Sequence, residues 1–405
     1  MSTDGPFRDL RVLDYCWVGA GAFVTRFLAD HGADVIKIES RARPDNLRVA
    51  PPYRPGAEGL EGSGYFASRN TSKRSFALNM SHPEAPGIAR RLARHASVVT
   101  SNFRPGVMER WQMDYASLRA VNPSLIFLSM PMQGSDGPNR SYIGFGSTIA
   151  ALTGLVGLSG RADRGPVGTG THYPDHIPNP GHALVALLGA LYRRERTGAG
   201  EAIELSQYES TINVLGPAVA AVSSGTEVTR RGNRVDDASP HNVFTCGGDD
   251  RWCAIAVRTD AQWVALCTEL GRPDLATDAR FASHDARKRH EDALEEEVCR
   301  ATAARDATDL AAALQAAGVP ASPVETTADV LADPQLNARD YWRRLDHPVM
   351  GSIVSSRAPF RASGMDAGPH RAAPMLGEHT REIAGELLGL GDAEIDDLVE
   401  RQVFY

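Results

Sequence analysis

The first forty residues constrain the fold of this chain more than any other stretch. Leu10–Tyr15 is a short apolar run typical of a buried strand, and Gly19-Ala20-Gly21 follows it. Residues 23–30 have the amphipathic pattern of a helix that ends near Gly32, and Val35–Glu39 has the pattern of a second strand. A strand, a glycine turn, a helix and a strand in so short a segment predict a βαβ unit with parallel strands and a right-handed crossover.

The glycine turn raises the question of dinucleotide binding. In the G-x-G-x-x-G fingerprint, three glycines let a pyrophosphate approach a helix N-terminus, and an acidic residue after the second strand binds a ribose. Gly19, Gly21 and Glu39 fit this pattern, whereas Val24 stands where the third glycine is required. A dinucleotide site therefore stays open as an alternative but is disfavoured.

Strand and helix patterns continue to alternate along the chain. Strands are expected over 75–78, 96–100, 124–129 and 202–205, and helices over 83–95, 116–121, 183–191 and 207–221. This alternation predicts an open α/β sheet with helices on both faces. Residues 40–70, rich in Pro, Gly and Arg, are expected to form loops without a regular element. Ligands bind such sheets at the carboxyl ends of the strands, which here are followed by Val18-Gly19, residues 102–106 and residues 130–132.

A proline-rich loop, Tyr173-Pro174-Asp175-His176, precedes the most apolar helical run of the chain. That run, residues 183–191, is apolar nearly all round and is therefore expected to be a buried helix. Asn179 and Pro180 are a good cap and first turn for it, which leaves Asp175 without a capping role. Asp175 is thus a candidate for chemistry, and the alternative that it only closes a turn stays open.

The composition is typical of a globular protein with two domains. The 405 residues carry a net charge of -7, which argues against nucleic acid or an anionic membrane as a partner. The N-terminus lacks the pattern of a signal peptide, no apolar run is long enough to span a membrane, and the five cysteines are scattered. We therefore expect a cytoplasmic protein without a metal site. We expect a large domain over 1–222, a linker over 223–240, a smaller α+β domain over 241–328, and a return to the large domain over 329–405.

Several short motifs follow one another in a specific order and spacing over nearly the whole chain. They are Leu10–Asp14, Ala29–Glu39, Asn70–Ser75, Asn102–Val107, Arg194–Gly198, Ala317–Ala321, Asp333–Leu336, His347–Gly351 and Leu376–Thr380. Each motif is weak alone, but together they resemble the class III (family III) coenzyme A transferases. That family includes the formyl-CoA, carnitine and benzylsuccinate CoA-transferases and the α-methylacyl-CoA racemases.

The resemblance implies a Rossmann-like large domain built from both chain ends, with a smaller domain from the middle, in ring-shaped chains that interlock as a homodimer. Such a sheet binds no dinucleotide, which accounts for the missing third glycine. In the family an aspartate, which by position looks like Asp175, attacks the acyl-CoA thioester to give an anhydride and then an aspartyl-CoA thioester. The substrates are an acyl-CoA and a carboxylic acid, and no cofactor is bound permanently. An ordinary carboxyl, with a pKa near 4, is already ionised at neutral pH and needs no base to become a nucleophile.

Carried over by position, the resemblance implies specific contacts. Contacts with CoA are expected at Val18, Gly19, Arg41, Lys73, Arg74, Asn102, Phe103 and Arg110, and a substrate pocket at Phe145, Gly146, Tyr173 and His176. The family often has a glutamine that covers the intermediate where this chain has Gly19, which we expect to leave room for a bulkier acid. Where the family has a basic residue this chain has Ser40, and Arg41 or Arg43 is expected to replace it. For Lys73 and Arg74 the alternative of a solvated surface position stays open.

Racemases of the family carry a histidine at the position of Gly146, and glycine cannot move a proton. The resemblance therefore favours acyl transfer over racemisation. An intramolecular CoA-transferring isomerase and a non-catalytic acyl-CoA binding protein stay open as alternatives. Residues 173–182 and 205–209 resemble the branch that acts on aryl- or alkyl-substituted succinates.

Overall fold

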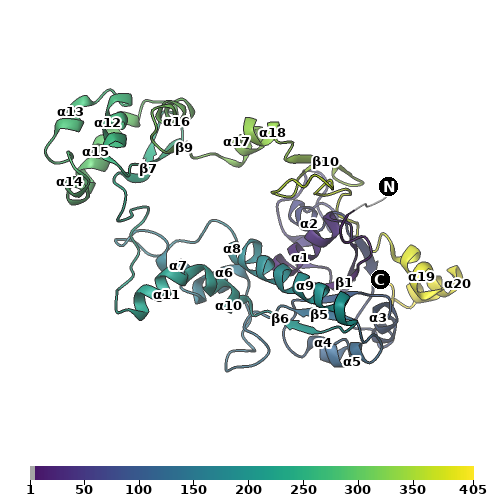
Figure 1. The fold of residues 1–405 in the computed structure, drawn as a ribbon. Coiled ribbons are helices and arrows are strands. Elements are labelled where there is room, and N and C mark those ends of the chain that lie inside the picture. Colours follow the sequence, from purple (N-terminus) through teal and green to yellow (C-terminus); the bar gives the residue numbers. More distant parts are fainter. Residues whose placement is uncertain (1–4) are drawn as a thin grey trace. The chain divides into compact units, whose positions relative to one another are not determined.

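The computed structural model of the chain describes residues 5–405, which form two compact units (Figure 1). Unit 1 comprises the chain up to Val156, Gly168–Thr226 and Asn337–Tyr405, and unit 2 comprises Gly157–Val167 and Glu227–Leu336. The expected domain limits at residues 222, 240 and 328 stay a prediction.

Unit 1 is built on a six-stranded parallel sheet with the order β3-β2-β1-β4-β5-β6. Its strands are β1 (Arg11–Tyr15), β2 (Asp34–Glu39), β3 (Arg74–Ala77), β4 (Val98–Ser101), β5 (Ile126–Ser129) and β6 (Ala202–Glu204). Every neighbouring pair is parallel, including β1 and β2 on either side of α1 (Gly19–Asp30). The predicted βαβ unit and the predicted α/β sheet are therefore confirmed. The order reverses between β1 and β4, which places a switch point at the carboxyl ends of those two strands.

Helices cover both faces of this sheet. Successive strand residues point to opposite faces, and apolar residues on both faces are buried. Val12 packs with α1 and α9 (Pro178–Thr197) on one face. Leu13 packs on the other face with a cluster that includes Ile88, Ile383 and Ile395. The helices of that second face are α3 (Ala85–Ala93), α4 (Val107–Arg110), α5 (Tyr115–Arg119), α19 (Thr380–Leu388) and α20 (Asp392–Glu400). The last residues of the chain thus share a core with the first strands.

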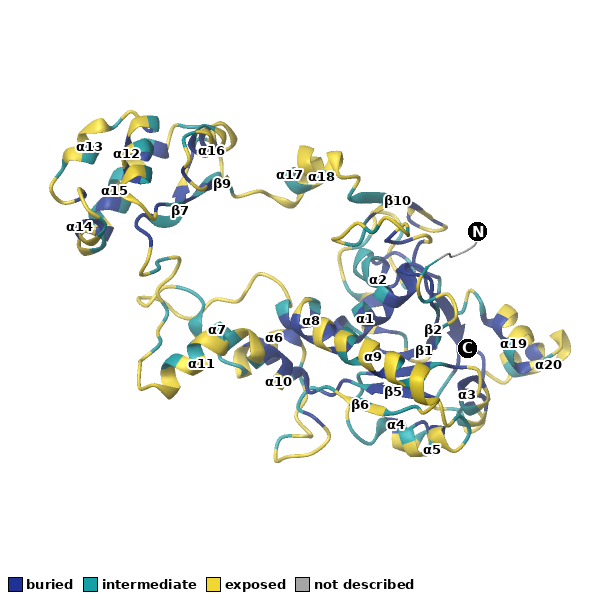
Figure 2. Cartoon of the chain, viewed as in Figure 1, coloured by how far each residue is buried: buried dark blue, intermediate teal, exposed yellow. Residues whose placement is uncertain are grey.

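Three local predictions are wrong. Residues 40–70 contain η1 (Asn46–Val49) and α2 (Gly64–Arg69), capped by the side chains of Asp45 and Ser63. The helix α9 is buried on one side only, and Figure 2 shows its other side exposed. Asn179 does not cap α9, since the helix begins at Pro178 and the Asn179 amide is buried and bonded to Gln207.

Shorter helices lie before and after β6 in the chain. Those of unit 1 are α6 (Gly146–Leu152), α8 (Tyr173–His176), α10 (Gln207–Ile212), η2 (Asn213–Leu215) and α11 (Gly216–Ser223), and α7 (Leu155–Leu158) spans the limit between the two units. The expected helix over 207–221 is thus interrupted at η2, just before Gly216-Pro217. A two-stranded antiparallel sheet, β10 (Trp342–His347) and β11 (Gly351–Ser356), completes unit 1. The helix α8 packs against α1, α6 and α9.

Unit 2 has its own antiparallel sheet in the order β7-β8-β9, with a core that includes Phe244, Trp263 and Leu310. Its strands are β7 (His241–Thr245), β8 (Trp252–Ala256) and β9 (Ala321–Pro323). Its helices are α12 (Asp260–Glu269), α13 (Pro273–Thr277), α14 (His284–Arg289), α15 (Glu291–Thr302), α16 (Ala307–Ala316) and α17 (Thr327–Ala332), and α18 (Pro334–Ala338) follows. Among the described residues, no helix combines the length and the apolar character that a membrane crossing requires.

Candidate active site

Asp175 is a buried carboxylate, 5% exposed, in the single turn α8. Two glycines allow it to sit where it does. A Cβ atom at Gly19 would lie 2.5 Å from Asp175 Cβ, and a Cβ atom at Gly146 would lie 2.5 Å from Asp175 Oδ2. No real side chain tolerates such distances, so both positions must lack a Cβ for Asp175 to occupy this place.

The first residues of α1 and α6 are thus brought against the carboxylate. The backbone N–H of Gly146 donates a hydrogen bond to Asp175. Gly19 is the first residue of α1, whose helix dipole favours a negative charge at that end. Both features stabilise negative charge at the site.

Burial raises the pKa of Asp175 to about 6, against the opposing effects of His172, the Gly146 N–H and Arg69. The expectation of an ordinary pKa near 4 is therefore wrong for this site. At neutral pH the carboxylate is still mostly ionised. Its raised pKa makes it more basic than a solvated aspartate, and basicity favours nucleophilic attack.

Asp175 lines a cavity of about 750 Å³ within unit 1, called here the Asp175 cavity. The cavity lies at the carboxyl ends of the parallel strands. Its walls come from the loops after β1 and β4, with Ile38–Ser40 at the end of β2, Leu78–Ser81 after β3, and Met132 and Gln207 after β5 and β6. It therefore occupies the switch point at which ligands bind to sheets of this order.

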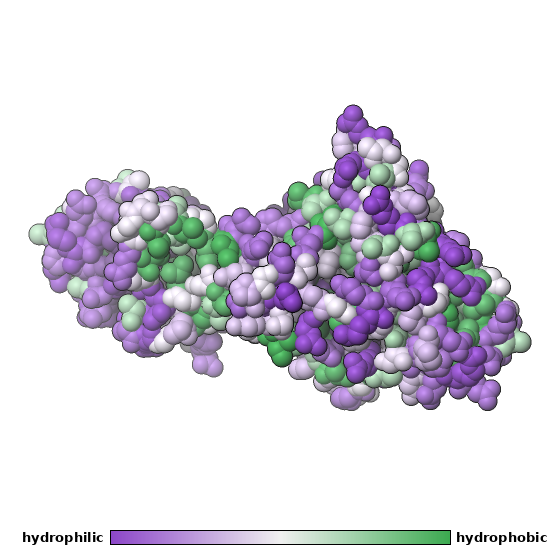
Figure 3. Space-filling view, turned by 90° about the horizontal axis from the view of Figure 1, so that it is seen from below, coloured by the Kyte–Doolittle hydropathy of each residue, from purple (hydrophilic) through white to green (hydrophobic). Residues whose placement is uncertain are grey.

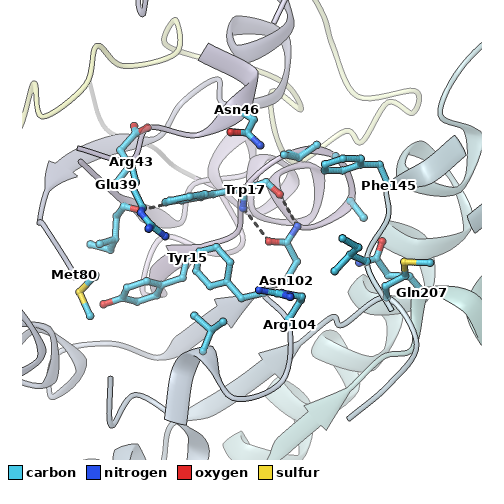
Figure 4. Close-up of a pocket in the computed structure, with 18 of the residues that line it drawn as sticks. Tyr15, Trp17, Glu39, Arg43, Asn46, Met80, Asn102, Arg104, Phe145 and Gln207 are labelled. Carbon is cyan, nitrogen blue, oxygen red and sulfur yellow. Dashed lines mark hydrogen bonds between the residues drawn. The ribbon is translucent and has the colours of Figure 1, made fainter. Parts of the chain in front are cut away.

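Trp17 and Asn102 hold the two central loops together. The Trp17 N–H donates to Asn102 Oδ1 at 2.9 Å, and Asn102 Nδ2 donates to the Trp17 carbonyl at 2.5 Å. Figure 4 shows this pair in the middle of the cavity wall, with Phe145 and Gln207 on one side and Arg43 and Met80 on the other. The rings of Trp17 and Phe103 meet edge to face at 5.1 Å and form an aromatic wall.

The charge of the cavity is positive. Arg43, Arg104 and Arg110 line it, and none of them forms an ion pair with a carboxylate of the described chain. Besides Asp175, Glu39 is the acidic residue in the lining, and it is paired with the buried Arg48 at 2.7 Å. Both carboxylate oxygens of Glu39 accept hydrogen bonds from Arg48 and are not available to a ribose. This removes the remaining support for a dinucleotide site.

Many of the expected site residues meet in this cavity, and others do not. Those that line it are Val18, Gly19, Asn102, Phe103, Arg110, Phe145 and Asp175. Those outside the lining are Arg41, Lys73, Arg74, Gly146, Tyr173 and His176. Gly146 nevertheless touches Asp175 through its N–H, and Arg43 lines the cavity where Arg41 does not. Groups of at least three His, Cys, Asp or Glu side chains that could hold a metal ion do not occur in residues 5–405.

Lys73 is not placed to contact CoA. Its ammonium group is fully buried and donates to Asp14, Thr25 and Asn70 at 2.7 to 2.9 Å and to the Ala22 carbonyl at 3.1 Å. An ammonium has three N–H donors, so these partners leave none for a phosphate. The alternative of a solvated lysine is equally wrong.

Arg74 is also held by protein partners and is not placed to contact CoA. Its guanidinium pairs with Asp34 at 2.6 Å, with Glu382 at 3.0 Å and with Glu386 at 2.9 Å. It joins β3 to α19 and does not face the Asp175 cavity.

The expectation that Gly19 leaves room for a bulkier acid is also wrong. The space beside Gly19 is filled by Asp175 itself, whose Cβ, Cγ and Oδ2 all lie within 2.6 Å of the position a Cβ would take. Gly19 therefore serves the close approach of the carboxylate.

Sequence reasoning missed several residues. Trp17 and Arg104 line the cavity, and Tyr65 and Arg69 of α2 interact electrostatically with Asp175. Arg104 stands inside the motif that had supplied Asn102 and Phe103, and Arg69 immediately precedes the motif that begins at Asn70. Arg104 belongs to the segment 102–106 expected at the ligand-binding edge of the sheet, and Arg69 directly adjoins a recognised motif.

Comparison with known proteins shows the family of the chain. The sequence model of CoA-transferase family III matches residues 7–380. A succinyl-CoA:D-citramalate CoA-transferase of Chloroflexus aurantiacus is 32% identical over 399 residues, which cover 98% of each chain. A probable CoA-transferase of Mycobacterium tuberculosis is 33% identical over 411 residues, and the match covers 99% of this chain but 50% of that longer protein.

A solved structure resembles the whole chain. The crystal structure of a CaiB/BaiF family protein from Brucella suis superposes with a TM-score of 0.87 at 33% identity, covering 95% of this chain and 99% of that one. Since the family model and the relatives match almost the whole chain, the chain belongs to CoA-transferase family III and is a CoA-transferase.

Proposed function

We propose that the enzyme transfers CoA from an acyl-CoA donor to a free carboxylic acid through covalent intermediates on Asp175. The Asp175 carboxylate attacks the thioester carbonyl, and the C–S bond breaks to give an acyl-aspartyl anhydride and CoA thiolate. The thiolate then attacks the aspartyl carbonyl, which releases the donor acid and leaves an aspartyl-CoA thioester. The acceptor carboxylate repeats both steps in reverse, so that Asp175 is regenerated as acyl-CoA leaves.

The observation that carries this proposal is the setting of Asp175. A buried carboxylate with a raised pKa faces a cavity, and a backbone N–H of Gly146 points at it. Such a donor also stabilises the oxyanion that develops when the aspartyl carbonyl is attacked. Gly146 offers no second base, which supports transfer over racemisation.

The Asp175 cavity suits the CoA moiety. Its volume of about 750 Å³ lies in the range typical of sites for small molecules and cofactors. We propose that Arg43, Arg104 and Arg110 bind the phosphates of CoA, since guanidinium groups without carboxylate partners are good phosphate ligands. The wall formed by Trp17 and Phe103 provides an aromatic surface for the adenine.

For the substrates we propose a dicarboxylic acyl-CoA as donor and a substituted succinate as acceptor. The relative from Chloroflexus aurantiacus is named for succinyl-CoA and D-citramalate. Residues 173–182 and 205–209 resemble the branch of the family that acts on substituted succinates. No permanently bound cofactor is part of this proposal.

We further propose that two ring-shaped chains interlock as a homodimer, with unit 1 and unit 2 as their large and small domains. An apolar stripe on α9 supports a partner surface. Val185, Leu188 and Tyr192 lie on one side of that helix and are 72%, 40% and 61% exposed. Figure 3 shows hydrophobic patches between hydrophilic regions on the surface of the molecule. Apolar surface of this kind marks sites of association.

The experiment that tests the proposed reaction follows an isotopically labelled free acid. With unlabelled succinyl-CoA and labelled succinate, the wild type is expected to place the label in succinyl-CoA, and the Asp175→Asn variant is not. An intramolecular isomerase would leave the label in the free acid. Full incorporation of label by the Asp175→Asn variant would contradict the role of Asp175.

A further inference from the structure

Arg69, the last residue of α2, is a half-buried cation beside Asp175. Its Nη2 atom lies 3.3 Å from Nδ1 of His176, one residue after Asp175. Its guanidinium carbon lies 5.0 Å from the centre of the Phe23 ring and 5.7 Å from the centre of the Tyr65 ring. Arg69 is thus held between two aromatic rings and an imidazole, next to the reacting carboxylate.

This guanidinium has no counter-ion of its own. No carboxylate of residues 5–405 lies within ion-pair distance of it, and its buried Nε has no hydrogen-bond partner among them. The neighbouring Arg26 shows the usual arrangement, since it pairs with Asp30 at 3.0 Å and donates to two backbone carbonyls. A buried donor without a partner is costly in a protein that has no use for it.

The residues around Arg69 do not compensate its charge. Burial and the nearby Arg69 lower the pKa of His176 to about 4, so this imidazole is neutral at neutral pH. The negative group that acts on Arg69 is Asp175. In the proposed reaction Asp175 becomes neutral when it is acylated, and Arg69 then keeps a positive charge without any balance.

We infer that Arg69 binds the non-reacting carboxylate of a dicarboxylic substrate while the other end of the molecule reacts at Asp175. The fork of the guanidinium matches the two oxygens of a carboxylate, and no carboxylate of the described residues competes for it. The Phe23 and Tyr65 rings flank the same place and provide apolar walls for the carbon chain between the two ends. The inference rests on the proposed reaction at Asp175 and names the residue that selects dicarboxylic substrates.

The test compares two acyl-CoA donors of equal chain length, succinyl-CoA and butyryl-CoA, in the first half of the reaction. Each donor is followed as transfer of CoA to one fixed acceptor, methylsuccinate, because kcat/KM for the donor in a double-displacement reaction reports the donor half alone. In Arg69→Gln we expect kcat/KM for succinyl-CoA to fall at least about tenfold more than that for butyryl-CoA, because both donors lose the effect of Arg69 on Asp175 and only succinyl-CoA loses a carboxylate contact. Arg69→Lys keeps the charge without the fork, and part of the preference for succinyl-CoA should return.

Arg104→Gln is the matched control, because it removes a guanidinium from the Asp175 cavity at the place proposed for a phosphate. It should raise KM for both donors equally. An equal loss for both donors in Arg69→Gln and Arg69→Lys, or no change in preference in either, would overturn the inference and leave the proposed reaction standing. If the wild type transfers no CoA from either donor, the proposed reaction itself is wrong.

Discussion

At the scale of single residues, the site depends on how closely two glycines approach one carboxylate. Gly19 and Gly146 each leave a gap that Asp175 fills, and Gly146 adds a hydrogen bond from its N–H. Burial pushes the pKa of Asp175 up, while His172, the Gly146 N–H and Arg69 pull it down. The outcome is a carboxylate that is ionised at neutral pH and yet weakly solvated, which is the state a carboxylate nucleophile needs.

This balance predicts the pH dependence of the reaction. In the proposed reaction Asp175 attacks only when it is ionised, and its pKa is raised to about 6, so acylation should fall as the pH drops through 6. Below that value, kcat/KM for the acyl-CoA is expected to fall about tenfold per pH unit. The measurement is the rate of acylation between pH 4.5 and 8 in buffers of constant ionic strength. A profile that stays flat down to about pH 4.5 would mean that Asp175 has an ordinary pKa or is not the nucleophile.

At the scale of elements, a buried ionic cluster ties the start of the sheet together. Lys73 precedes β3 and reaches Asp14 of β1 and Thr25 of α1. Lys37 of β2 pairs with Asp45, which caps η1 and accepts from the N–H of Val18 in the cavity wall. Buried ion pairs thus fix the loops that line the Asp175 cavity.

We therefore expect Lys73→Met to act on stability. It would leave the Asp14 carboxylate buried without its cation, which typically costs about 3–5 kcal/mol. Chemical denaturation followed by circular dichroism measures this loss. Arg110→Met, at an exposed position in the cavity lining, is the control and should raise KM for acyl-CoA without a comparable loss. Unchanged stability together with weaker CoA binding in Lys73→Met would restore the original assignment of Lys73 as a CoA contact.

The elements that could be predicted from the sequence are those that local patterns determine. The strands and helices of the βαβ unit follow from short apolar runs, and their parallel pairing follows from the crossover between them. The cap that starts η1 depends on Asp45, which is itself held by Lys37 from another strand, so no local pattern revealed it. The burial of Lys73 cannot be predicted locally for the same reason, because its partners lie on β1 and α1.

The same distinction between local and distant determinants applies to the site. Asp175 and the loops after β1 and β4 could be placed from motifs and from the order of the strands. The pKa of Asp175 could not, because it depends on burial and on Arg69, which lies far away in the sequence. The position of Arg69 near Asp175 could not be predicted either, because it depends on the packing that brings α2 beside His176 of α8.

At the scale of the whole molecule, the two ends of the chain build unit 1, and the middle builds unit 2. The residues of unit 1 that follow unit 2 contribute α19 and α20, whose apolar side chains join the core on one face of the sheet. The apolar stripe of α9 on the opposite face has no cover within the described residues of the chain. This is the surface that the proposed partner chain would bury.

The proposed homodimer can be tested through that stripe. The wild type is expected to run as a dimer in size-exclusion chromatography with light scattering at micromolar concentration. Val185→Glu should weaken the dimer, because a charge in an apolar interface must be desolvated without a partner. Glu296→Gln, at an exposed position on α15, is the control and should leave the mass unchanged. A wild type that is monomeric throughout would contradict the proposal.

The central claim is a covalent bond to Asp175, and mass spectrometry tests it most directly. The enzyme is incubated with succinyl-CoA and hydroxylamine, digested, and the peptides are sequenced. We predict that Asp175 is converted to its hydroxamate, in the wild type only and only when acyl-CoA is present. Transfer of CoA at the normal rate with Asp175 unmodified, or with the hydroxamate on another residue, would contradict the account.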